Sequence, residues 1–176
     1  MFNQFKKTAL VAAAGLAFVA TPAFAQSVNP AEAEGQAVVR ILQPLVIDAT
    51  DGTLDFGVHV KDGAAPGTNY SFPIGTTATS TITCATDWAC SGATNPAAFT
   101  VTGAAAETVQ LTVDASVNLD DNGQATFPTA TLLLSDATLP LTGGADPFHV
   151  GGTLTVDGGI NNGIYSGTFN VSAEYL

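Results

Sequence analysis

The clearest pattern of hydrophobic and polar positions lies in residues 165–175, where every second position is apolar or glycine. These positions are Tyr165, Gly167, Phe169, Val171, Ala173 and Tyr175, and the positions between them carry Ser, Thr, Asn or Glu. Successive side chains of a β-strand point to opposite faces, so the alternation predicts a strand with one apolar and one polar face. The apolar face predicts packing against another part of the protein.

Shorter segments of the same kind fill most of residues 36–176. Alternation predicts a strand over residues 108–119, and we also predict one over residues 148–156. An apolar run predicts one strand in two parts, residues 37–43 and 45–48. Pro44 separates the two parts because proline has no N–H to give to a ladder. No segment of ten or more residues in the mature chain shows a helical apolar period with caps. Short strands between turn signals are typical of a β-sandwich or barrel, so we predict one all-β domain over residues 36–176.

The first 25 residues have the pattern of a signal peptide. Lys6 and Lys7 precede an apolar stretch over residues 8–20, and Ala23-Phe24-Ala25 fits the small-x-small cleavage motif. The polar residues 26–35 then read as a flexible leader. We therefore expect export through the inner membrane, to the periplasm, the cell surface or an extracellular fibre.

The charge of the chain is strongly acidic. Without the signal peptide, Arg40 and Lys61 remain as the strong bases against fifteen Asp and Glu, a net charge of −13 instead of −11. Nucleic acid is an unsuitable partner because no basic patch is available to neutralise phosphates. Membrane insertion is not expected either, since no segment of the mature chain reaches the roughly 18 unbroken apolar residues of a spanning helix.

Cys84 and Cys90 are the two cysteines of the chain. An even count in an exported protein favours a disulfide, which here would clip a short loop. The spacing differs from the Cys-x-x-Cys of redox proteins, and zinc would need further ligands nearby.

Residues for catalysis are sparse. His59 and His149 are the two candidate bases, and neither lies in a recognisable triad context. Asp120 and Asp121 read as a hairpin turn, with a weak surface calcium site as the alternative. Trp88, Tyr70 and Phe72 read as packing residues, with a sugar-binding platform as the alternative. We expect neither enzymatic activity nor a cofactor.

Several motifs resemble one bacterial family. Leu45-Val46-Ile47, Leu54-Asp55-Phe56-Gly57, the stretch over residues 148–154 and the closing stretch over residues 163–175 are similar to the domain of unknown function family 4402. The resemblance covers the chain from about Gly35 to Leu176, and the family name carries no function.

A looser resemblance adds a function. The Leu-Asp-Phe-Gly block and the closing Gly-x-Tyr-x-x-Thr-x-x-Val-x-x-x-Tyr pattern are similar to the spore coat U family and to subunits of archaic chaperone–usher pili. That resemblance implies an immunoglobulin-like β-sandwich completed by a donated strand, with other copies or related subunits, a periplasmic chaperone and an usher as partners. The cysteine positions differ from the usual disulfide of those subunits.

The resemblance also assigns residues to strand exchange. Gly35-Gln36-Ala37-Val38-Val39 is similar to the start of a donor segment, and the last strand would be the edge that accepts it. The assembly residues are then Val38, Val39, Ile41, Tyr165, Gly167, Phe169, Val171 and Tyr175. We predict a structural or adhesive subunit of a surface fibre or pilus. The alternative is a self-contained exported β-sandwich that binds carbohydrate or another envelope protein, with residues 37–43 as its own first strand.

Overall fold

The computed structural model describes residues 33–120 and 127–176. The predicted signal peptide, residues 26–32 of the leader, and Asp121 with the hairpin turn around it lie outside these residues. The chain divides into two units, Met1–Val39 and Arg40–Leu176, and the second of them holds all the strands described below.

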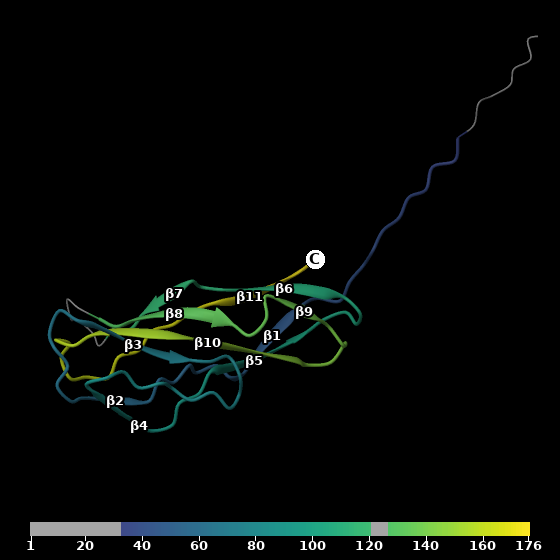
Figure 1. Cartoon of the computed structure of the whole chain (residues 1–176). Coiled ribbons are helices and arrows are strands. Elements are labelled where there is room, and N and C mark those ends of the chain that lie inside the picture. Colours follow the sequence, from purple (N-terminus) through teal and green to yellow (C-terminus); the bar gives the residue numbers. More distant parts are fainter. Residues whose placement is uncertain (1–32, 121–126) are drawn as a thin grey trace, which may run out of the picture. The chain divides into compact units, whose positions relative to one another are not determined.

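The described residues form β-strands and no helix, which confirms the all-β prediction. Figure 1 labels the strands in chain order: β1 (Val46–Asp51), β2 (Val58–Lys61), β3 (Asn69–Ile74), β4 (Trp88–Ser91), β5 (Ala97–Thr102), β6 (Thr108–Val113), β7 (Ser116–Asn118), β8 (Thr129–Leu134), β9 (Thr138–Pro140), β10 (Asp146–Asp157) and β11 (Val171–Tyr175).

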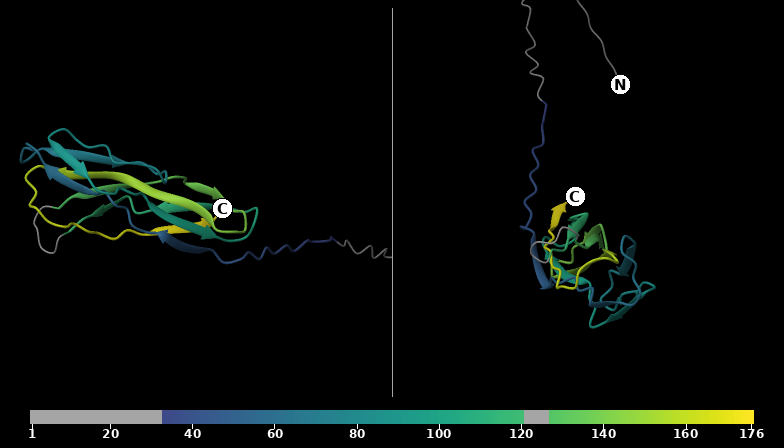
Figure 2. Two further views of the ribbon diagram at one scale, coloured as in Figure 1. Left: turned by 90° about the horizontal axis from the view of Figure 1, so that it is seen from below. Right: turned by 90° about the vertical axis from the view of Figure 1, so that its left-hand side faces the viewer.

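The strands form three antiparallel sheets. The largest has the order β1-β5-β10-β8-β7, with β3 also paired to β10, and the second has the order β11-β6-β9. The third is the pair β2-β4. The long strand β10, the long yellow-green ribbon in the left view of Figure 2, joins the first sheet together, because β5 and β3 pair with successive parts of one edge and β8 with the other.

Two hydrophobic clusters lie between these sheets. In one, Val101 and Phe148 of the large sheet pack with Val109 and Leu111 of β6, so apolar faces of two sheets cover each other as in a β-sandwich. In the other, Phe72, Leu154 and Val156 of the large sheet pack with Phe56 and Ile160, and with half-buried residues of β4. The alternating sequence pattern thus produces the sandwich that it predicts.

The predicted strand over residues 37–43 is wrong. The register aligns Val46 with Thr102, the last residue of β5, so residues before Val46 have no ladder partner on that strand. Pro44 also removes one donor. Residues 33–45 are therefore outside every strand, whereas the second predicted part, residues 45–48, is confirmed by β1.

The predicted strands over residues 108–119 and 165–175 are shorter in the structure. β6 ends at Val113, and the chain then moves to the large sheet as β7. Val171 pairs with Val113, so β11 loses its partner N-terminal to Val171. The Asp114 carboxylate accepts a hydrogen bond from the Asn170 amide N–H at 2.8 Å, at the point where the ladder begins.

Candidate functional site

An open groove of about 1070 Å³ lies on the part of the chain that the structure describes. One wall consists of residues 52–61, which follow β1 and include β2, and the other consists of residues 160–169, which precede β11. The floor is apolar, with Val117, Leu119, Leu154 and Val156. The groove therefore lies between the segment that follows β1 and the segment that precedes β11.

The wall formed by β2 presents apolar side chains because of a turn at Gly57. Gly57 has a φ of 78°, and its N–H donates to the Asp55 carboxylate at 2.8 Å. A left-handed residue of this kind suits glycine, and it changes which face the following side chains occupy. As a result Phe56 is buried, while Val58 and Val60 of β2 are 55% and 54% exposed and line the groove.

The opposite wall holds three of the predicted assembly residues. Tyr165 is half-buried and its hydroxyl donates to the Asn161 carbonyl at 2.9 Å. Phe169 is half-buried, with its ring 6.3 Å from that of Phe99 in an edge-on contact. Gly167 packs so tightly on β7 that a Cβ there would lie 2.4 Å from the Asn118 carbonyl oxygen.

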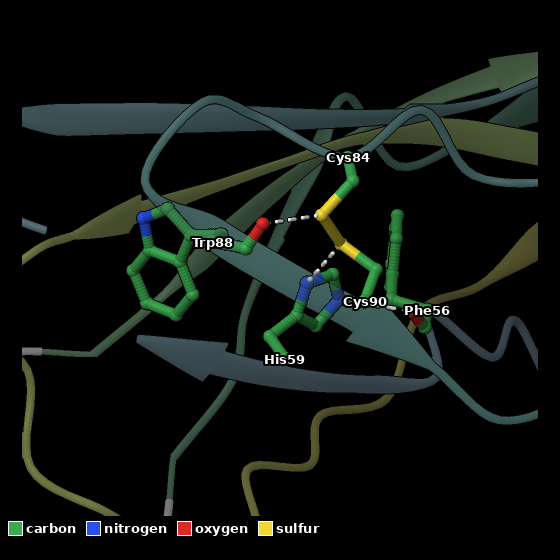
Figure 3. The surroundings of a disulfide bond; sticks show 5 residues. All are labelled: Phe56, His59, Cys84, Trp88 and Cys90. Carbon is green, nitrogen blue, oxygen red and sulfur yellow. Dashed lines mark hydrogen bonds between the residues drawn. A yellow bond between two sulfur atoms is a disulfide. The ribbon is translucent and has the colours of Figure 1, made fainter. Parts of the chain in front are cut away.

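The disulfide between Cys84 and Cys90 is present, as predicted, and it supports the β2 wall (Figure 3). Cys90 lies opposite His59 in the β2-β4 pair, with 3.5 Å between Cys90 Sγ and His59 Nδ1. His59 Nε2 donates to the Phe56 carbonyl at 2.9 Å. Burial lowers the pKa of His59 below its ordinary value of 6.5, against the opposing effect of that hydrogen bond.

The aromatic side chains of Tyr70, Phe72 and Trp88, for which a sugar-binding platform was the alternative, pack against one another. Phe72 is fully buried, and the Trp88 ring meets it edge-on with 5.3 Å between centroids. Tyr70 meets Trp88 in the same way at 5.7 Å. This confirms the packing interpretation, and Trp88 also lines the groove at the β2 wall.

Both strands that continue the groove walls are outermost strands. β1 ends the large sheet and β11 ends the three-stranded sheet, so each pairs on one side within the described residues. Val171, Ala173 and Tyr175 of β11 are only half-buried, and they pack beside Leu45 and Ile47 against the core. The apolar face that the sequence predicts is thus real and is incompletely covered.

The two edges run antiparallel to each other. The Tyr175 hydroxyl, at the end of β11, donates to the carbonyl of Gln43, just before β1, at 2.7 Å. At their other ends, Gly52 after β1 and Phe169 before β11 line the same groove. Each of the two edges can pair with an added strand on its open side.

The structure also describes the three N-terminal residues that the resemblance assigns to strand exchange. Val38, Val39 and Ile41 are 89%, 82% and 88% exposed and lie outside the strands. We call residues 36–43 the arm. The arm and the groove walls are thus separate parts of the chain. The arm carries exposed apolar side chains, and the walls enclose an open groove with an apolar floor.

A family model with the description "Domain of unknown function (DUF4402)" matches residues 47–175. The chain belongs to this family. The DUF4402 match spans both groove walls, most of β1 and all of β11, and the arm precedes it. No curated protein and no solved structure matched the chain.

Other kinds of site are not prominent in this DUF4402 domain. Within residues 33–120 and 127–176, no three His, Cys, Asp or Glu side chains gather closely enough to hold a metal ion. No helix in these same residues has the length and apolarity to cross a membrane. Asp120 is paired through its backbone with Ser166, an antiparallel bridge next to the groove wall.

Proposed function

We propose that this protein is a non-enzymatic structural subunit of an exported surface fibre, in which the arm of one copy fills the groove of another. One observation carries the proposal: the walls of an apolar groove continue two outermost strands, β1 and β11, and an exposed apolar arm precedes the first of those strands. The resemblance to pilus subunits supports the same function, and the Cys84–Cys90 disulfide suits an exported protein.

The arm has the chemistry of a strand that completes a sheet. Ala37, Val39 and Ile41 share one parity, so an extended arm would point these three side chains toward the floor of the groove. Full burial of a Val or Ile side chain contributes about 1.5–3 kcal/mol, so Val39 and Ile41 together would contribute about 3–6 kcal/mol. Main-chain hydrogen bonds to the two edges would add to this contribution and fix the register.

The receiving groove has the chemistry that such a strand requires. Its floor is apolar and its β2 wall exposes Val58 and Val60. Exposed apolar edges of this kind invite pairing with another chain, and natural proteins usually protect them. Occupation by the arm of a second copy would protect both the edges and the apolar floor.

The test is assembly of the full chain on an SDS gel without boiling. We expect a ladder of oligomers for the unchanged protein, and loss of that ladder in the double variant Val39→Asp, Ile41→Asp, because two carboxylates would enter an apolar groove. Leu133→Asp is the matched control, since Leu133 is 63% exposed on β8 and outside the groove. A ladder that survives in the double variant, or that is absent from the unchanged protein, would rule out the proposal.

A further inference from the structure

The hydroxyl of Tyr175 joins three parts of the domain. It donates to the Gln43 carbonyl at 2.7 Å and accepts from the Ala104 N–H at 2.7 Å, so it links β11, the start of the domain and the loop after β5. Gly103 provides the space, because a Cβ there would lie 2.6 Å from the Tyr175 hydroxyl oxygen. The Gln43 carbonyl is therefore held by one hydrogen bond from a hydroxyl that the Ala104 N–H holds in place.

A second contact holds the chain beyond that point. The Arg40 guanidinium forms an ion pair with Glu107, whose side chain is largely buried. Glu107 directly precedes β6, and the Thr108 carbonyl accepts a hydrogen bond from the N–H of Leu176, the residue after β11. Arg40 is thus held near the C-terminal end of β11, whereas the groove walls lie at its N-terminal end.

The backbone at residues 43–45 also favours a path that leads the arm away from the groove walls. Gln43 precedes Pro44, and a residue before proline is restricted to extended conformations. Leu45 is half-buried in the cluster around Val101 and Phe148. A reversal of the chain at residues 43–45 would have to release Gln43 from Tyr175 and turn next to the proline.

We propose that Tyr175 and Arg40 form a latch that prevents the arm from folding back into the groove of its own domain and so directs it to another copy. The inference rests on the proposed function, because it explains why a chain that carries both an arm and a groove would assemble. To fill its own groove, the arm would have to turn back beside β1. The latch opposes that turn at its first residue, since the hydroxyl of Tyr175 holds the Gln43 carbonyl.

The test uses the full chain at concentrations where it is monomeric. The latch variant is Tyr175→Phe, Arg40→Gln, and the matched control is Tyr70→Phe, which removes a hydroxyl that accepts from the Ala65 N–H and is outside the groove. Amide hydrogen exchange of residues 38–43 reports where the arm lies. Capture of a labelled synthetic peptide of residues 35–43 reports whether the groove is open.

In the latch variant we expect the arm to fill the groove of its own copy, because one or two net hydrogen bonds that oppose this are lost. The arm amides should then exchange about fivefold to tenfold more slowly, and less peptide should be captured. The slowing should not depend on protein concentration, which separates self-filling from exchange between copies. The unchanged protein and Tyr70→Phe should show fast arm exchange and full capture. Arg40→Gln alone affects a contact at the surface and should shift both readings in the same direction, which keeps the test decisive if the double variant fails to fold.

The two ideas fail in different ways. If the unchanged protein captures the peptide and the latch variants capture it equally, with equally fast arm exchange, the latch is wrong while strand exchange stands. If the unchanged protein captures no peptide, strand exchange is wrong and the latch falls with it.

Discussion

Substitution of Gly103 by alanine tests how tightly the ends of the domain are packed. The added Cβ would lie 2.6 Å from the Tyr175 hydroxyl oxygen, 2.7 Å from Leu45 Cδ2 and 2.8 Å from Leu141 Cδ1. Overpacking of this kind costs about 1–3 kcal/mol, and displacement of the Tyr175 hydroxyl would weaken two hydrogen bonds worth about 0.5–1.5 kcal/mol each. The φ of Gly103 is outside the left-handed region, so alanine gains about 0.4–1 kcal/mol from the unfolded state. We expect a net loss of about 1–5 kcal/mol in the free energy of unfolding.

Equilibrium unfolding in urea measures this loss as a lower midpoint at an unchanged slope. Gly144→Ala is the control, because its nearest neighbour would be Thr142 Oγ1 at 3.6 Å and its φ is also outside the left-handed region. That variant should stay within about 0.5 kcal/mol of the unchanged protein. Equal midpoints for the two variants would show that Leu45, Leu141 and Tyr175 do not enclose Gly103 as described.

Three further predictions concern the core and the β2 wall. Because the pKa of His59 is lowered in the folded state, protonation favours the unfolded state, and the free energy of unfolding should fall as pH drops below about 6.5; urea midpoints across pH should lose that dependence in His59→Gln and keep it in His149→Gln. Replacing Cys84 and Cys90 by serine should cost about 2 kcal/mol by the loop-entropy estimate; an unchanged thermal midpoint, or two free thiols in the unchanged protein, would contradict this. Phe72→Ala should cost about 3–5 kcal/mol in urea unfolding because the side chain is fully buried, whereas Leu133→Ala should cost less than about 0.5; similar losses in both would contradict the core assignment.

The alternation of apolar and polar residues predicted the fold class and several strands correctly. Residues 148–156 lie within β10, where pairing on both edges reinforces the local pattern. Tyr165, Phe169, Val171, Ala173 and Tyr175 are all half-buried while their polar neighbours are exposed, so the faces are as predicted even where no ladder forms. Alternation reports which face a side chain occupies, and the length of a strand depends on its partner.

The positions of the partner strands also explain why some predicted strand bounds were wrong. Residues 37–43 are β-prone, but β5 ends opposite Val46 and leaves them unpaired. Residues 108–119 keep one parity but divide between two sheets after Val113. Neither fact is visible from local sequence, because each depends on where a distant strand ends.

The groove was only partly predictable. The last strand and the N-terminal segment followed from the pattern and the resemblance, but the wall formed by Val58 and Val60 did not. Those residues share parity with buried Phe56 but are more than half exposed on the groove wall, and the turn at Gly57, with its positive φ, separates them from Phe56. The Asp55-Phe56-Gly57 sequence was the available signal, since an Asp side chain and a following glycine favour a turn.

Crosslinking from the arm tests the central claim most directly. A photoreactive residue at Ile41 would be activated in an equal mixture of chains labelled with light and heavy nitrogen, and crosslinked peptides would be identified by mass. Strand exchange between copies predicts light–heavy pairs that join the arm to residues 52–61 or 160–169, the two groove walls. Crosslinks within one copy, or to residues outside both walls, would contradict assembly by strand donation.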